Sequence, residues 1–288
     1  MKQLNFFIEL TRLKKPIGFM LLFWPCAWGL TLAYDISDNL NNYFFYLTLF
    51  FLGSVLMRSA GCIVNDILDK ELDKKVFRTK NRPIASGKIS IKLGLVYAVF
   101  LCFFSLLVLL NFNNFTIILA LGSMPLAFSY PLMKRYTYWP QLFLGITFNY
   151  GLILGWTSIH SELTNIPIIL YFGAIFWTLG YDTIYGFQDI KDDELIGVKS
   201  TSIKFKKNPK IFIMSCYLIF ISTLITVGIF MNFKYLFFIF LLLPTLYIYF
   251  LQIKKFRIEN PMNCLEIFKK NNFLGFLIFA NILIGKIF

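Results

Sequence analysis

Long apolar runs, separated by short polar segments, extend over almost the whole chain. Nine of these runs have the length of about 20 residues that a helix needs to cross a bilayer. They cover residues 17–34, 42–64, 91–110, 114–132, 139–159, 165–186, 211–231, 233–253 and 271–288. The pattern predicts an all-α integral membrane protein, with nine transmembrane helices in one bundle. No Gly/Ser/Pro-rich linker divides residues 1–288, so we expect a single membrane domain.

The composition agrees with a membrane protein and gives its orientation. Apolar residues make up 58% of the chain and charged residues 15%, against about 45–50% and about 25% in soluble domains. All but Arg58, Lys234 and Lys286 of the 28 Lys and Arg residues lie before the first run or near the connections after even-numbered runs. The positive-inside rule therefore predicts a cytoplasmic N-terminus and an external C-terminus. The net charge of +13 follows from this topology, so we expect no nucleic-acid partner.

Two polar segments, about 65–90 and 182–205, combine acids with bases on the predicted cytoplasmic side. The first reads "NDILDKELDKKVFRTKNRP" and the second "YDTIYGFQDIKDDELIGVKST". Each begins at the end of an apolar run with acids and continues into bases. We expect the two segments to meet over a common cavity.

The first segment has oxygen-bearing side chains at one-turn spacing. Asn65, Asp69 and Asp73 recur at i, i+4 and i+8, which places them along one face of a helix. Carboxylates at this spacing repel one another unless a cation lies between them. Hard oxygen ligands suit Mg²⁺, which is often shared between carboxylates and substrate phosphates. Asp66 and Glu71 face away from this stripe, so we expect them to be solvated.

The second segment repeats this arrangement. Asp189 and Asp193 are again one turn apart, with Asp192 beside them. Asp182, seven residues before Asp189, is predicted to share its helical face. A solvated helix end of mixed charge is the alternative interpretation of either cluster alone. Two clusters at equivalent positions favour a metal site.

Basic residues follow the acids on the same side of the membrane. Carboxylates with nearby Arg and Lys favour a cation together with a polyanion, because Arg binds phosphate oxygens in a bidentate manner. Membrane topology or lipid-headgroup contact would also account for each base separately. The bases that we assign to a diphosphate are Arg78, Arg82, Lys134, Arg135 and Lys199.

Arg58 lies within a spanning helix, seven residues before Asn65. An Arg at this depth costs at least about 2.5–3.5 kcal/mol, so it needs a partner. The partner is either Asp182, backbone carbonyls, or the carboxylate of a substrate bound beside the metal.

Several kinds of chemistry have little support. His160 is the only His and falls in a predicted external connection, which argues against haem ligation, zinc chemistry and His-based catalysis. No G-x-x-x-x-G-K-[ST] motif is present, so ATP-driven transport is unsupported.

At the N-terminus, Leu4, Phe7, Ile8 and Leu10 predict a short amphipathic helix.

The motifs together resemble those of the UbiA-type intramembrane prenyltransferases. They are N-D-x-x-D-x-x-x-D at 65–73, "RTKNRPIASG", "YPLMKR" from Tyr130, and the second acidic segment. The second motif is most similar to that of enzymes which prenylate 4-hydroxybenzoate in ubiquinone biosynthesis. The likeness extends from about Arg12 to Phe205, and the last three helices match in hydropathy only.

This resemblance implies a nine-helix bundle around a central cavity and Mg²⁺-dependent transfer of a polyprenyl group to an aromatic acid. The implied metal ligands are Asn65, Asp69, Asp73, Asp189 and Asp193. The bases named above would neutralise the diphosphate, Tyr130 would bind substrate, and Asp182 or Asp192 would assist the phenol or take the ring proton. Our assignment of Arg58 to the carboxylate of the acid rests instead on its burial and its spacing from Asn65. The site would open to the cytoplasmic side of a bacterial inner membrane, with no obligatory protein partner.

Two other functions remain open. A related transferase would use another acceptor, such as dihydroxynaphthoate or haem, and haem is disfavoured because His160 lies on the opposite side. A divalent-cation transporter is the second, although transport sites usually lie near the bilayer midplane and these acids lie at one face.

Overall fold

Helices account for all the regular secondary structure in residues 2–288, the part of the chain that the computed structural model describes. Eight helical segments are long and apolar enough to cross a membrane, whereas the apolar helix α2 (Ile17–Ala33) has only 17 residues. The eight are α3 (Leu40–Leu68), α5 (Ile91–Leu109), Asn114–Tyr136, α9 (Pro140–His160), α10 (Asn165–Gly186), α13 (Pro209–Phe230), Tyr235–Lys254 and α16 (Pro261–Ile287). The predicted all-α membrane class is confirmed. The count of nine crossings and the orientation stay predictions.

Two of the spans consist of several short helical pieces. Asn114–Tyr136 comprises α6 (Asn114–Gly122), α7 (Met124–Ser129), the 3-10 turn η1 (Tyr130–Leu132) and α8 (Met133–Tyr136). Tyr235–Lys254 comprises α14 (Tyr235–Phe240), α15 (Leu242–Tyr247) and the π-helical turn η2 (Ile248–Lys254). Pro125, Pro131 and Pro244 lie in or beside these breaks. A proline has no N–H group for the helical ladder, which explains the interruptions.

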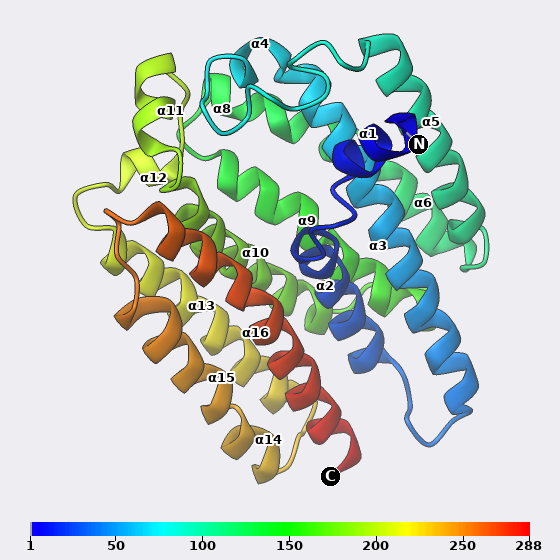
Figure 1. The fold of residues 1–288 in the computed structure, drawn as a ribbon. Helices are drawn as coiled ribbons and strands as arrows, with labels where there is room; N and C mark the ends of the chain where they lie inside the picture. Colours follow the sequence, from blue (N-terminus) through cyan, green and yellow to red (C-terminus); the bar gives the residue numbers. More distant parts are fainter. Residues whose placement is uncertain (1) are drawn as a thin grey trace.

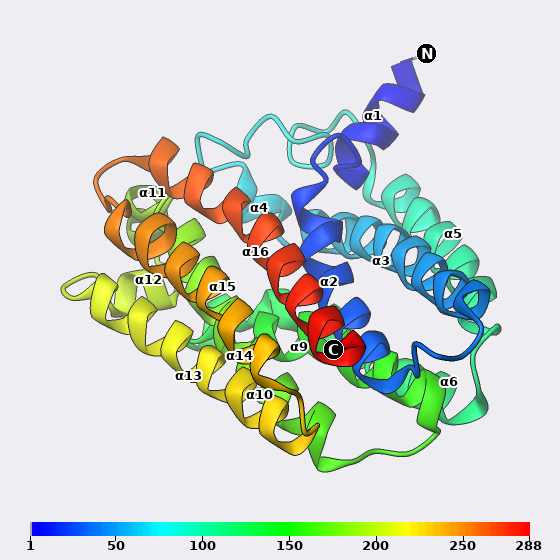
Figure 2. The ribbon, with the colours of Figure 1, turned by 90° about the horizontal axis from the view of Figure 1, so that it is seen from below.

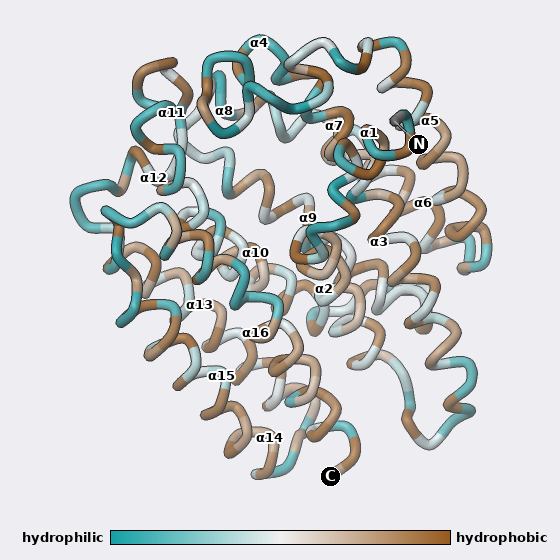
Figure 3. The backbone as a smooth tube through the Cα atoms, in the orientation of Figure 1, coloured by the Kyte–Doolittle hydropathy of each residue, from teal (hydrophilic) through white to brown (hydrophobic). Residues whose placement is uncertain are grey.

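The remaining short helices gather at one end of the bundle. They are α1 (Lys2–Thr11), α4 (Lys70–Asp73), α11 (Ile190–Ile196) and α12 (Thr201–Lys204). In Figure 1 they lie toward the top with α8, and the C-terminus lies at the opposite end. The hydrophilic backbone segments are concentrated at this same end, above predominantly hydrophobic helices (Figure 3). A site for a charged ligand is therefore expected at this polar end of the bundle.

Helix α2 lies inside the bundle, between α3, α9 and α16 (Figure 2). It approaches α9 closely because Gly29 and Gly155 lie at their contact, where any side chain would overlap the backbone of the other helix. Trp28 of α2 packs against Trp177 and Phe220, with ring centroids 4.9 and 5.8 Å apart. These ring contacts join α2 to α10 and α13.

Candidate active site

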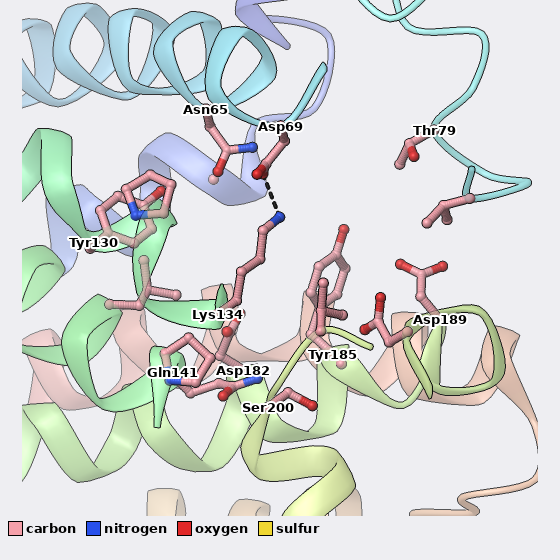
Figure 4. A pocket seen from close by; sticks show the side chains of 18 of the residues that line it. Asn65, Asp69, Thr79, Tyr130, Lys134, Gln141, Asp182, Tyr185, Asp189 and Ser200 are labelled. Atoms are coloured by element: carbon pink, nitrogen blue, oxygen red, sulfur yellow. Dashed lines mark hydrogen bonds and ion pairs between the residues drawn. The ribbon is translucent and has the colours of Figure 1, made fainter. Parts of the chain in front are cut away.

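A cavity of about 330 Å³ opens at the polar end of the bundle and is lined by both acidic segments. All of the predicted site residues except Arg135 and Asp192 line it. They are Arg58, Asn65, Asp69, Asp73, Arg78, Arg82, Tyr130, Lys134, Asp182, Asp189, Asp193 and Lys199. Figure 4 shows residues from α3, α8, α10 and the loops between them around this space. The expected meeting of the two segments is confirmed.

The first acidic motif does not lie along one continuous helix, but its predicted one-turn spacing is kept, because the Asp69 N–H donates to the Asn65 carbonyl at 2.9 Å and the Asp73 N–H donates to the Asp69 carbonyl at 2.8 Å. Helix α3 ends at Leu68, Asp69 has φ −94° and ψ 5°, and α4 begins at the next residue. The guanidinium of Arg135 donates a hydrogen bond of 2.5 Å to the Leu68 carbonyl, which a continuing helix would have used itself. The three oxygen-bearing residues still line the same cavity.

The second acidic motif is interrupted in a similar way. Helix α10 ends at Gly186 before α11 begins, so Asp182 and Asp189 lie on different elements although both line the cavity. The Thr183 carbonyl, near the end of α10, accepts a hydrogen bond of 2.7 Å from the Ser202 hydroxyl. The prediction of one shared helical face is therefore wrong, while the shared cavity is confirmed.

Each acidic motif is paired with a cation from a distant part of the chain. The Lys134 ammonium lies 2.5 Å from an oxygen of Asp69 (Figure 4). Arg78 donates to both oxygens of Asp189, from Nε at 2.9 Å and from Nη2 at 2.5 Å. Such bidentate pairs are strong and geometrically specific. The second pair joins the loop after α4 to the loop before α11.

The carboxylates of the cavity are buried close to one another, which disfavours their negative charges. Asp69 is 1% exposed, and its Oδ1 atom has no hydrogen-bond partner among residues 2–288. Burial raises the pKa of Asp73, and burial together with the nearby Asp189 carboxylate raises the pKa of Asp193 to about 6. An additional cation in the cavity would stabilise all of these anionic groups.

A metal would have to displace some of the present ion pairs. In the described part of the chain, no three His, Cys, Asp or Glu side chains form a ready metal site. Lys134 occupies one oxygen of Asp69, and Arg82 lies 2.8 Å from Asp73. The donor set nevertheless fits a hard divalent ion, because the residues are carboxylates and an amide around one cavity, and one Asp69 oxygen has no hydrogen-bond partner in the described part of the chain.

Asp66 is not solvated, contrary to the expectation from its place on the motif. It is 2% exposed and accepts hydrogen bonds from Arg12 at 2.6 Å and from Arg82 at 3.1 Å. Glu71, in contrast, is exposed and pairs with Lys74 as a surface residue would. Asp66 lies on α3, before the break after Leu68, and it is buried because Arg12 and Arg82, which are remote in sequence or beyond the break, cover its face of the helix.

Two predicted residues lie outside the cavity lining. The Asp192 carboxylate accepts a hydrogen bond of 3.2 Å from the backbone N–H of Phe77, and so connects α11 to the loop after α4. Arg135 caps α3 and approaches the second oxygen of Asp69 only to 3.8 Å. Both residues hold the polar end together instead of facing its cavity.

Arg58 stands between this polar cavity and a second cavity of about 480 Å³ with mainly apolar walls. Arg58, Tyr130 and Phe148 line both spaces. The Arg58 guanidinium lies 5.2 Å from the centre of the Phe148 ring, a cation–π contact. Within residues 2–288 it forms no salt bridge, so the predicted alternative of pairing with Asp182 is not formed.

Several lining residues were not assigned from the sequence. Tyr181, Tyr185 and Phe268 are aromatic residues among 35 Phe and 15 Tyr, so no pattern singled them out. Gln141 is held by a hydrogen bond of 2.9 Å from the backbone N–H of Thr201. The remaining unassigned polar residues of the lining are Arg12, Lys15, Thr79 and Ser200. Arg12 and Lys15 stand out in the sequence as bases near the N-terminus, but membrane topology alone also explained their presence.

The sequence matches a known family over most of its length. Residues 22–279 match the UbiA prenyltransferase family. The human protein named "4-hydroxybenzoate polyprenyltransferase, mitochondrial" is 40% identical over 282 residues, which cover 98% of this chain and 75% of that protein. The Lithospermum erythrorhizon protein named "4-hydroxybenzoate geranyltransferase 2" is 40% identical over 288 residues, 100% of this chain and 92% of its own.

Solved structures share the fold. A UbiA homolog from Aeropyrum pernix in its apo form superposes with a TM-score of 0.75 at 21% identity, covering 93% of this chain and 98% of that one. A UbiA homolog from Archaeoglobus fulgidus bound to GPP and Mg²⁺ gives a TM-score of 0.70 at 16% identity, covering 97% and 99%. From the family match and the identity to these relatives, the chain belongs to the UbiA prenyltransferase family.

Proposed function

We propose that the protein transfers a polyprenyl group from a polyprenyl diphosphate to the ring of 4-hydroxybenzoate, in an Mg²⁺-dependent step of ubiquinone biosynthesis. The observation that carries this proposal is the junction of two unlike cavities. A polar cavity rich in carboxylates and bases adjoins an apolar one, and Arg58, Tyr130 and Phe148 line both. A diphosphate ester with a hydrocarbon tail has the same two halves. The human and Lithospermum relatives are both named for 4-hydroxybenzoate.

The acidic residues would hold the metal. Asn65, Asp69 and Asp73 form one group of ligands, and Asp189 with Asp193 forms the other, across the same cavity. When bound, Mg²⁺ would supply positive charge to the departing diphosphate. The Archaeoglobus homolog bound to GPP and Mg²⁺ supports a divalent ion in a fold of this kind.

The bases of the lining would bind and neutralise the diphosphate. Arg78, Arg82, Lys134 and Lys199 line the cavity, and Arg78 and Lys134 at present neutralise acids. As the bond between the prenyl carbon and the diphosphate oxygen breaks, the electron pair leaves with the oxygen. Fixed cations at that position stabilise the developing charge more than they stabilise the bound substrate.

The acceptor would lie at the junction of the cavities. The Arg58 guanidinium there forms no salt bridge with the other described residues and suits the carboxylate of 4-hydroxybenzoate, while its contact with Phe148 holds the side chain in place. The ring would then face the prenyl carbon, and a carbon–carbon bond forms beside the phenol group. Asp182 lines the polar cavity and Asp192 does not, so we assign to Asp182 the role of accepting the ring proton.

The setting in the cell is part of the proposal. We place residues 1–288 in a bacterial inner membrane as one domain, with the N-terminus and the cavity on the cytoplasmic side. The distribution of Lys and Arg along the sequence supports this orientation. The prenyl chain length is left open, because relatives of equal identity are named for geranyl and for polyprenyl transfer.

A parallel acceptor assay tests the proposed function. Purified protein, Mg²⁺ and a polyprenyl diphosphate are offered 4-hydroxybenzoate, dihydroxynaphthoate or haem, and the products are weighed by mass spectrometry. We expect prenylated 4-hydroxybenzoate, and none of it when the metal is chelated. Transfer to dihydroxynaphthoate or haem instead would replace our acceptor.

His160 is the last residue of α9, and the cavity is at the other end of this helix. At 1.5 Å per residue the two ends are about 30 Å apart, so His160 gives haem no ligand at the cavity.

The transporter alternative has a separate test. Asp69→Ala and Asp189→Ala are reconstituted in liposomes and assayed for prenyl transfer and for divalent-cation flux. Loss of transfer without a change in flux supports the enzyme, and the opposite result supports a transporter.

A further inference from the structure

Asp66 is a buried carboxylate of the acidic motif that does not line the cavity. It is 2% exposed, and its Oδ1 atom accepts from Nη2 of Arg12 at 2.6 Å and from Nη1 of Arg82 at 3.1 Å. A buried carboxylate is stable only when its charge is compensated in this way. Two guanidinium groups that share one anion are in turn held close together. Both of those Arg residues line the polar cavity.

Arg12 reaches this position through an unusual turn of the chain. It directly follows α1 and has a φ of +56°, in the left-handed region that is uncommon for residues other than glycine. The same turn contains a hydrogen bond of 2.8 Å from the Lys15 N–H to the Arg12 carbonyl. Such a conformation persists where its surroundings compensate its cost. The ion pair between the Arg12 side chain and Asp66 provides this compensation.

The helix that carries Arg12 is fixed against the bundle. Leu10 is fully buried in a cluster with Ile63 of α3 and Ile84 of the following loop. Phe7 contacts Tyr97 of α5, with ring centroids 5.1 Å apart. Figure 1 shows α1 beside α3 and α5 at the polar end. The position of α1 and the direction of the Arg12 side chain are therefore coupled.

Arg82 connects this pair to the acidic residues of the site. Its Nη1 atom lies 3.1 Å from Asp66 and 2.8 Å from Asp73, so one nitrogen is shared between two carboxylates. Without the Asp66 charge, Arg82 would be drawn fully to Asp73, and Arg12 would lose its only salt bridge in the described residues. The cationic edge of the cavity depends on Asp66 although Asp66 itself does not face the cavity.

We propose that Asp66 is a positioning residue, which holds the guanidinium groups of Arg12 and Arg82 at the cavity edge and so makes the N-terminal helix part of the diphosphate site. This inference rests on the proposed function, because it assigns those two cations to the prenyl diphosphate. It assigns no contact between Asp66 and the substrate.

The test uses the full chain and measures binding and turnover separately. Binding of geranyl diphosphate with Mg²⁺, without an acceptor, is followed by calorimetry for wild type, Asp66→Asn, Arg12→Gln and the double variant. We expect each single variant to weaken binding about tenfold, and the double variant to add little, because both changes remove the same arrangement. The KM for geranyl diphosphate should rise, while the KM for the aromatic acid stays unchanged.

Two further variants separate positioning from misfolding. Arg12→Gly removes the side chain at a φ that suits glycine, so it should weaken binding while α1 stays folded. Glu71→Gln neutralises an exposed acid of the same motif and should leave binding unchanged.

Three results would decide against the inference or its basis. Unchanged binding in Asp66→Asn and in Arg12→Gly overturns the inference. Fully additive effects in the double variant also overturn it, because independent roles predict them. If wild type itself binds no geranyl diphosphate, the proposed function fails, and that failure is distinct from the other two.

Discussion

Lys134 of α8 and Asp69 at the end of α3 form an ion pair of 2.5 Å in the wall of the polar cavity (Figure 4). The two residues are far apart in sequence, and the second Asp69 oxygen is buried without a hydrogen-bond partner among the described residues. In the proposed function, Asp69 binds the metal and Lys134 binds the diphosphate. Each residue neutralises the other in this structure, and we predict that the pair separates when substrate and metal bind.

Removal of the Asp69 charge is expected to abolish metal-dependent turnover. Asp69→Asn keeps the size of the side chain but gives the metal a neutral ligand, so we expect kcat to fall at least about 100-fold. The measurement is prenyl transfer over a range of Mg²⁺ concentrations. Glu71→Gln is the matched control, because Glu71 is exposed on the same motif. Wild-type turnover in Asp69→Asn would contradict the assignment.

Arg58 is expected to control affinity for the aromatic acid only. Its guanidinium lies at the junction of the two cavities and contacts Phe148 at 5.2 Å. Loss of one charge-assisted contact in Arg58→Gln should raise the KM for the acid about tenfold or more, with the KM for the diphosphate unchanged. Arg257→Gln, in an exposed loop, serves as the control. An unchanged KM for the acid would remove Arg58 from the acceptor site.

Asp182 and Asp192 are expected to differ in their effect on catalysis. Asp182 lines the cavity, whereas Asp192 accepts a hydrogen bond from the Phe77 backbone outside it. Loss of a proton acceptor in Asp182→Asn should lower kcat about 100-fold with little change in either KM. Asp192→Asn should lower kcat much less. Steady-state kinetics of both variants give the two kcat values. An equal decrease of kcat in both variants would contradict the assignment of the proton acceptor to Asp182.

The apolar cavity is expected to limit the length of the prenyl chain. Gly61 lines it, and a Cβ atom added there would meet no other atom within 4 Å. Gly61→Leu should therefore fold and reduce turnover of long prenyl diphosphates more than that of geranyl diphosphate. Gly122→Leu, at an exposed glycine with equally open space outside the cavity lining, is the control. The same decrease for all chain lengths would mean that the tail lies elsewhere.

The sequence predicted much of the fold because helices in a membrane follow from hydropathy. Every predicted run coincides with a helix or a helical segment, including α2 with its 17 residues. The two acidic segments were also correctly expected to share a cavity, since they are on one side of the membrane and carry the same residue types. The ends of α3 and α10 were not predicted. Near these ends the backbone carbonyls of Leu68 and Thr183 accept hydrogen bonds from Arg135 and Ser202, which are remote in sequence.

The site contains residues that no local pattern marks. Arg12 reaches the cavity through a left-handed turn, and such a conformation is not evident from an arginine in a sequence. Asp66 was expected in solvent because a continuous helix would have turned it outward. Its burial depends on two arginines, one from α1 and one from the loop after α4. Tertiary contacts of this kind decide which charges are buried.

The most direct test of the central claim is a structure of the protein with a metal and an uncleaved substrate analogue. Crystals with Mn²⁺ in place of Mg²⁺ and a prenyl thiodiphosphate would reveal the metal by its anomalous signal. We predict metal signal beside Asp69 and Asp189, the diphosphate between Arg78 and Lys134, and the prenyl tail in the apolar cavity below Arg58. Metal signal away from both acidic groups, or a tail outside that cavity, would contradict the account.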